Sequence, residues 1–252
     1  MNLRDIAKLS SIRKKLFYSV EDLFREAKGS IDVLGYTFKK ESYFAIFDIE
    51  VSDFSNQSAL KELSVVKCCA SNSKIEYECI GPLDVSRMDA KQKAIQLFNE
   101  LERSNYRLLS HNLKSDLRWL NGAFGGSIVT TNAVCSMHDI NWRKYGYNSK
   151  GLEFLLFKKN LFFAAHQSLS DCLAVLALMV THPNELSLID TSLALIKIEI
   201  KMTDEIVKLE QMGYEIYESK MLGVVHVEKY LLDAEISNLL HLEIKMNQIS
   251  IL

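Results

Sequence analysis

Residues 1–40 show the apolar spacing of two helices. In the first, apolar residues recur every third or fourth position with many basic residues between them: Leu3, Ile6, Leu9, Ile12 and Leu16. This spacing places them on one helical face. A second helix is predicted to begin after Ser19, a favourable N-cap residue, and to end at Gly29. The basic first helix could contact a phosphate backbone, but a solvated face on a packed helix is the simpler interpretation.

From residue 43 onward, the pattern is that of strands followed by alternating helices and strands. Apolar runs rich in β-forming residues predict strands at 43–51, 63–70, 74–80, 106–110 and near 129 or 133–135. Helical spacing predicts helices at 88–103, 114–120, 138–145, 151–158 and 168–181. An initial hairpin followed by alternation predicts a mixed sheet covered by helices, which is an α/β fold.

The pattern changes again after residue 184. It predicts a long helix, a small hairpin and a last helix at about 187–211, 214–217 with 224–227, and 232–245. We therefore expect three parts: a helical N-terminal extension (1–40), a central domain (41–183) and a small α+β extension (184–252).

The composition is that of a globular protein, with 48% hydrophobic and 25% charged residues, which excludes a disordered chain. The net charge of −2 excludes broad attraction to nucleic acid, so a polyanion would need a local basic patch or a metal. Five cysteines without a C-x-x-C pair are expected to be reduced thiols. Without a membrane-spanning window of about 20 apolar residues or a signal-peptide core, we expect a cytoplasmic protein and no membrane partner.

An acidic pair follows the apolar run of the first predicted sheet strand. Alternation places Asp48 and Glu50 on one face, with Cβ atoms about 7 Å apart. Two such charges beside a buried run are unfavourable unless a cation lies between them, and Mg²⁺ or Mn²⁺ prefers carboxylate oxygen. The alternative is a strand end with two solvated acids.

Two later segments carry further polar side chains. His111, Asn112 and Asp116 follow a predicted strand, where an acid in the first helical turn could simply favour the helix dipole. Asp171 lies near the start of another helix and could be a capping residue after Ser168 at the N-cap. His166, in the preceding loop, could fold over this acid and take a proton from water at neutral pH.

In this order the three segments resemble the DnaQ-like 3′–5′ exonucleases with a catalytic histidine. That family shows an Asp-x-Glu strand, a His-Asn-x-x-x-Asp helix start and a final His-x-x-x-x-Asp, which this chain matches over about residues 43–181. Residues 134–155 are also similar to a bacterial subgroup like the DNA polymerase III epsilon subunit. The resemblance implies a ribonuclease H-like fold, with a mixed five-stranded sheet, helices on both faces and the acids at its centre.

The resemblance also implies a site and a reaction. Four carboxylates would hold two Mg²⁺ or Mn²⁺ ions about 4 Å apart: Asp48, Glu50, Asp116 and Asp171. His166 would be the general base, and three residues would contact substrate: Ser52, His111 and Asn112. The implied activity shortens single-stranded 3′ ends and releases nucleoside 5′-monophosphates, with DNA modestly favoured over RNA.

Three departures from the family pattern favour a rival hypothesis. Val51-Ser52-Asp53 replaces Thr-Thr-Gly, Ser115 replaces a phenylalanine, and Gln167-Ser168 replaces Arg-Ala. The rival is a catalytically weak or inactive module that binds nucleic acid or a protein. A polymerase or other protein partner could dock on residues 184–252 or on the basic N-terminal helix.

Four phenylalanines between the second and third segments are expected to pack beneath the last helix of the domain: Phe154, Phe157, Phe162 and Phe163. Stacking of one of them on a base is the alternative. The sequence shows no basic and aromatic platform that would decide between DNA and RNA.

Overall fold

The computed structural model describes residues 18–52, 60–126, 133–201, 203–217, 222–228, 232–241, 244 and 248–251. The first predicted helix lies outside the described residues. The chain divides into two compact units, residues 1–189 and 190–252. This division follows residue 189, whereas we predicted a boundary near residue 184. Each unit has its own sheet and is described separately.

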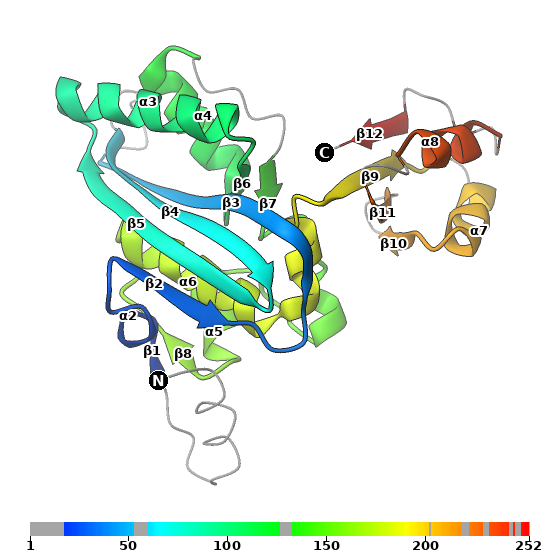
Figure 1. Cartoon of the computed structure of the whole chain (residues 1–252), viewed down its shortest axis with the longest axis horizontal. Coiled ribbons are helices and arrows are strands. Elements are labelled where there is room, and N and C mark those ends of the chain that lie inside the picture. Colours follow the sequence, from blue (N-terminus) through cyan, green and yellow to red (C-terminus); the bar gives the residue numbers. More distant parts are fainter. Residues whose placement is uncertain are drawn as a thin grey trace, which may run out of the picture. The chain divides into compact units, whose positions relative to one another are not determined.

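A six-stranded mixed sheet forms the centre of the larger unit (Figure 1), in the order β2-β5-β4-β3-β6-β7. Its strands are β2 (Lys28–Asp32), β3 (Phe38–Val51), β4 (Leu60–Asn72), β5 (Lys74–Asp84), β6 (Arg107–Ser110) and β7 (Ala133–Cys135). Strands β2 to β5 pair antiparallel, whereas β6 is parallel to β3 and to β7. The expectation of a mixed α/β sheet is confirmed, with six strands rather than five.

Seven helices and a short ribbon accompany the sheet in the described part of this unit. The helices are α2 (Val20–Leu23), α3 (Met88–Arg103), α4 (Leu113–Phe124), η1 (Trp142–Tyr145), α5 (Leu152–Phe157), α6 (Ser168–Thr181) and η2 (Pro183–Leu188). The ribbon pairs β1 (Tyr18–Ser19) in parallel with β8 (Leu161–Phe162). No described helix has both the length and the apolarity needed to cross a bilayer.

Alternation along β3 divides the core between the two faces of the sheet. Ala45 and Phe47 belong to a buried cluster with residues of α3 and α4. Phe44 and Ile46 are also fully buried but point to the other face, where α6 packs against β3 and β4. Residues 48 and 50 share their parity, so β3 directs its two acids toward the α6 face.

The smaller unit is an α+β fold with its own core. Its elements are β9 (Leu193–Glu199), α7 (Thr203–Gln211), β10 (Glu215–Tyr217), β11 (Leu222–Glu228), α8 (Leu232–His241) and β12 (Ile249–Ile251). The strands form an antiparallel sheet in the order β10-β11-β9-β12. The predicted hairpin is confirmed as β10 and β11.

Two predicted helices are wrong, and a third, predicted at 138–145, is present only as the short 3-10 helix η1 at Trp142–Tyr145. Most of the second predicted helix is absent, because α2 makes a single turn and residues 28–32 form β2, the edge strand beside β5. The long helix at 187–211 is also incorrect, since the chain forms β9 before α7. Ile196 and Ile198 are buried while Glu199 is exposed, and this two-residue period is that of a strand. Residues 18–40 therefore belong to the larger unit rather than to a helical extension.

Candidate metal centre

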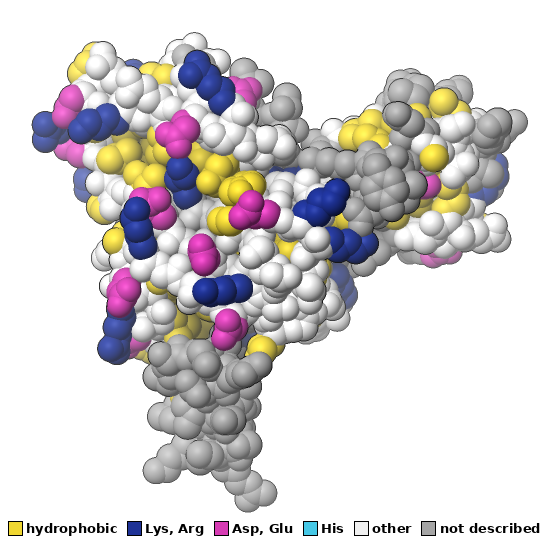
Figure 2. All heavy atoms as spheres, viewed as in Figure 1, with side chains coloured by type: hydrophobic (Ala, Val, Ile, Leu, Met, Phe, Trp, Pro, Cys, Tyr) yellow, Lys and Arg dark blue, Asp and Glu magenta, His cyan; other side chains and the backbone are white. Residues whose placement is uncertain are grey.

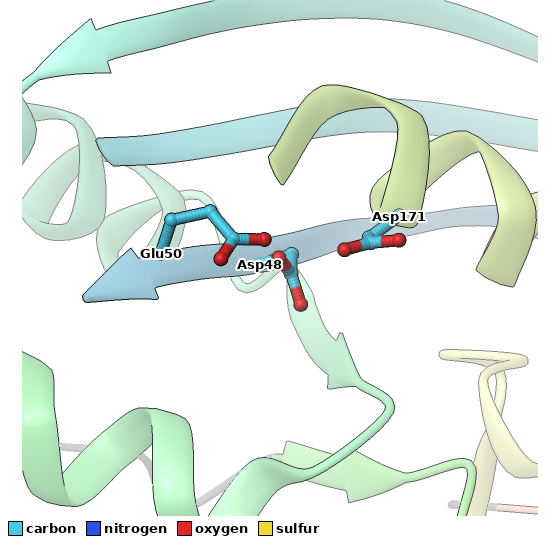
Figure 3. Close-up of side chains that lie close together, drawn as sticks. All are labelled: Asp48, Glu50 and Asp171. Atoms are coloured by element: carbon cyan, nitrogen blue, oxygen red, sulfur yellow. The ribbon is translucent and has the colours of Figure 1, made fainter. Parts of the chain in front are cut away.

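Three carboxylates from two elements converge at the central strand (Figure 3). Asp48 and Glu50 project from β3, and Asp171 projects from the first turns of α6. One oxygen of each lies within 4.8 Å of an oxygen of the other two. They meet because α6 packs on the face toward which the even-numbered residues of β3 point.

Asp48 has the most strongly raised pKa of the three acids, and one of its oxygens has no hydrogen-bond partner in the described structure. That oxygen is Oδ2, which is buried. Burial raises the pKa of Asp48 well above its usual range, and the charges of Asp116 and Asp171 raise it further. A buried oxygen without a partner, surrounded by other acids, is unfavourable by itself. These hard oxygen donors fit a divalent cation such as Mg²⁺ or Mn²⁺.

Glu50 and Asp171 lie close together, with carboxylate oxygens within 4.8 Å of each other. Burial raises the pKa of both groups, and that of Asp171 reaches about 7. A cation between the two groups would offset their mutual repulsion and would compete with protons for their oxygens.

Asp116 adjoins this group from the first turn of α4. Its side chain is buried and accepts a hydrogen bond from Ser110 Oγ, while its backbone N–H donates to Asn112 O at 3.1 Å. Burial raises the pKa of Asp116 to about 7, although the Ser110 bond opposes the shift. Asp116 lies outside the group of three within 4.8 Å, but its charge acts on Asp48 and it lines the same cleft.

His166 lies in the loop between β8 and α6, as predicted, and it is exposed. Its backbone has a φ of 63°, in the left-handed region, and its N–H donates to Asp171 Oδ2 at 3.2 Å. The imidazole is close enough to lower the pKa of both Glu50 and Asp171, against the larger effect of burial. The ring thus lies beside the acids and in contact with solvent.

A cleft of about 310 Å³ brings these groups together. Its lining includes the five side chains predicted as ligands and base: Asp48, Glu50, Asp116, His166 and Asp171. The segments that supply them are separated by up to 123 positions in the sequence, counted from residue 48 to residue 171. The fold therefore gathers the acids and the imidazole around one solvent-accessible space.

The three predicted substrate-contacting residues occupy different positions. His111 lines the cleft but is buried; its Nε2 donates to Lys150 O at 2.9 Å, so Nδ1 accepts from Ser136 Oγ at 2.8 Å. Burial lowers its pKa to about 4, so the ring is neutral. Asn112 is exposed in the cleft, and Ser52 is exposed just after β3, outside the lining of the cleft.

His111 therefore links the residue after β7, Ser136, to the loop before α5 through its two ring nitrogens. Asn112 is the better placed of the three to contact a bound molecule, because its side chain is exposed at the cleft. Asp53, which departs from the family pattern, lies outside the described residues.

Sequence reasoning missed two carboxylates that fix the start of α6. Glu62 on β4 accepts hydrogen bonds from the N–H and Oγ of Ser168 at 3.2 and 2.7 Å. Glu21 accepts from Ala164 N–H at 2.8 Å and from Ser170 Oγ. The N-cap of α6 is Gln167, so the predicted N-cap role of Ser168 is wrong. No local motif links residues more than 100 positions apart.

Charge is evenly distributed on the face of the larger unit that Figure 2 shows. Acidic and basic side chains are interspersed there, with apolar side chains between them. This distribution agrees with the net charge of −2. On this face, attraction for a polyanion would have to come from a local feature such as a bound cation.

Comparisons with known proteins assign no family. No protein-family model matches the chain, and no curated protein matches it significantly. The residues of the cleft are therefore the basis for a functional conclusion.

Proposed function

We propose that this protein is a metal-dependent 3′–5′ exonuclease that shortens single-stranded nucleic acid. The observation that carries the proposal is the convergence of four acids and an imidazole on one cleft, with a buried Asp48 oxygen that lacks a protein partner. This combination is unfavourable without a cation and suited to hydrolysis with one.

The architecture supports the proposal. Strands β5, β4, β3, β6 and β7 form a mixed sheet with β3 at its centre, and helices pack on both faces. The acids extend from that central strand and from the starts of α4 and α6. We propose that this core is ribonuclease H-like and that β2 is an added edge strand.

The four acids would hold two Mg²⁺ or Mn²⁺ ions, through Asp48, Glu50, Asp116 and Asp171. When bound, such ions neutralise charge on the phosphodiester and on its leaving oxygen. A ring nitrogen of His166 accepts a proton from the attacking water. Water adds to phosphorus as the bond from phosphorus to the 3′ oxygen of the preceding nucleotide breaks, which releases a nucleoside 5′-monophosphate. The hydrogen bond from His166 N–H to Asp171 fixes the loop that carries the base.

The test is digestion of 5′-labelled single-stranded DNA and RNA with Mg²⁺ or Mn²⁺. We expect stepwise shortening from the 3′ end, abolished by Asp48→Asn and strongly reduced by His166→Asn, with DNA modestly preferred. Asp32→Asn, which changes an exposed acid on β2, is the matched control and should retain activity. Shortening that persists in Asp48→Asn would refute the assignment.

The rival function is a module that binds nucleic acid or a protein without cutting. It is favoured by Gln167, which places no positive charge beside His166 where the related family has arginine. Binding of oligonucleotide without any shortening, unchanged by Asp48→Asn, would support this rival.

A further inference from the structure

A second cavity opens beside the cleft. It has a volume of about 390 Å³ and is lined by Glu153, Phe154, Phe157, Leu161, Phe162 and Phe163. Glu153 and Phe163 also line the cleft that holds the acids, so the two cavities adjoin. The volume lies within the usual range for sites that bind small organic groups.

Two aromatic rings of this cavity are exposed to solvent. Phe157 is 57% exposed and Phe162 is 52% exposed, so the expectation of packing beneath the last helix is wrong for these two, whereas Phe154 and Phe163 are half-buried. The buried residues of the same segment are Leu155, Leu156 and Leu161. Helical spacing in α5 and alternation in β8 direct these leucines inward and leave the two rings at the surface. Exposed rings grouped around one cavity are typical of a binding surface.

A cation contacts one of the rings that line this cavity, Phe154. The Lys158 ammonium nitrogen lies 5.0 Å from the centroid of the Phe154 ring. Flat rings bind nucleobases by stacking, and a neighbouring ammonium attracts the phosphates between them. The sequence 154–163 contains these aromatic and basic residues, but only the folded segment places them around one space beside the acids.

We propose that this aromatic cavity binds bases of single-stranded nucleic acid that lie 5′ of the terminal nucleotide. The inference rests on the proposed function, because the scissile phosphate would occupy the adjoining cleft. Paired bases in a duplex do not present their faces, so the cavity selects unpaired strands. Glu153, between the two cavities, can accept a hydrogen bond from a sugar hydroxyl or a base N–H.

Binding of a labelled ten-nucleotide oligothymidine tests this site, measured by fluorescence anisotropy with Mg²⁺. All proteins carry His166→Asn, which slows digestion but removes none of the four acids expected to hold metal, and the full chain is used. Phe157→Ala and Phe162→Ala should each weaken binding about 5- to 150-fold, the range for loss of one stacked base. Phe157→Trp, which keeps a flat ring at this position, should bind as well as the protein with Phe157. Lys158→Gln should lower the slope of log affinity against log salt by about 0.7.

Abasic oligonucleotides test the same contact from the side of the nucleic acid and need no further protein variant. Abasic sites just 5′ of the terminal nucleotide should weaken binding as much as Phe157→Ala does, and the two changes together should cost little more than either alone. Met88→Ala, at a 68% exposed position on α3, is the matched control and should bind normally.

The outcomes separate the two proposals. If the wild-type protein shortens oligonucleotides but neither ring substitution nor abasic sites affect binding, the stacking site is refuted and the exonuclease remains. An abasic penalty that persists undiminished in Phe157→Ala would also refute it. If the protein with the background substitution does not bind oligonucleotides and the wild-type protein does not shorten them, both proposals fail.

Discussion

Asp48 carries the least satisfied polar atom of the candidate site. Replacement by asparagine removes one negative charge from the group and changes little in shape. We expect Asp48→Asn to lose activity by about 10²-fold or more, the scale on which removal of transition-state electrostatic stabilisation acts. Because repulsion falls, the metal-free variant should melt no lower than the wild type. Calorimetry with and without Mg²⁺ should show that its metal-induced rise in Tm is lost, whereas Asp32→Asn retains it.

The raised carboxyl pKa values predict how stability depends on pH without metal. Burial raises the pKa of Asp116 and Asp171 from 3.8 to about 7, so the folded state holds protons that the unfolded chain has already lost. This contribution to stability is fully present below pH 3.8 and is lost as pH rises through about 7. Two buried histidines act oppositely, because burial lowers the pKa of His111 and His182 from 6.5 to about 4.

Above about pH 6.5 the two histidines are less than half protonated in the unfolded chain and neutral in the folded one, so the acids dominate there. We expect the Tm in EDTA to fall between pH 6.5 and pH 8, and Mg²⁺ to reverse this fall by replacing the protons. Thermal melts at several pH values measure the effect. A flat profile in EDTA would show that the acids do not share the buried environment described here.

His166 combines an exposed imidazole with a backbone in the left-handed region. Asparagine tolerates that conformation better than most residues, so His166→Asn removes the base without straining the loop. We expect kcat to fall about 10²- to 10⁴-fold while the Mg²⁺-induced rise in Tm is retained. Steady-state kinetics together with thermal melts check both parts. Loss of the Tm response would instead assign His166 to metal binding.

At the scale of elements, α2 is tied to the loop that carries His166. Glu21 accepts hydrogen bonds from Ala164 and Ser170; although burial alone would raise the pKa of Glu21, these bonds lower it. Glu21→Ala should reduce the free energy of unfolding by about 1–2 kcal/mol and lower kcat more than it changes KM. Glu21→Gln keeps an acceptor oxygen and should recover part of both losses. Equal effects of the two variants on kcat would argue against a positioning role.

The helices and strands that could be predicted are those with one clear apolar period. Helix α3 matches its predicted bounds, 88–103, because its apolar residues keep helical spacing throughout. Strand β9 was missed because Leu193 and Ile196 also fit helical spacing, and strand pairing with β11 decides the outcome. Strand β2 was missed because an edge strand of alternating exposed residues carries little apolar signal.

Some residues of the candidate site could be predicted from the sequence and others could not. The sharing of one cleft by the four acids and His166 could be predicted, because each lies in a short motif at a strand end or helix start. Glu21 and Glu62 could not, since each acts on residues more than 100 positions away. Base stacking by one of the four phenylalanines was only the alternative, and the cavity itself could not be predicted. The sequence indicates which residues are apolar but not that Phe157 and Phe162 remain exposed.

At the scale of the whole molecule, every residue of the candidate site belongs to the larger unit, and each unit has its own core. We expect a chain truncated after residue 189 to fold and to keep the Mg²⁺-induced rise in Tm. Circular dichroism and thermal melts measure this. An unfolded product would show that the larger unit depends on residues 190–252.

Because side chains alternate along β3, ion binding requires that β3 be paired with β4 in its native register. If β3 slipped by one position against β4, Asp48 and Glu50 would turn into the apolar cluster beneath α3 and α4, and Phe47 and Ile49 would face α6. Such a misaligned chain has no carboxylate pair to offer a cation. Chains that take up Mg²⁺ during refolding are therefore those whose central pairing is already native, and added Mg²⁺ should enrich them over misaligned competitors.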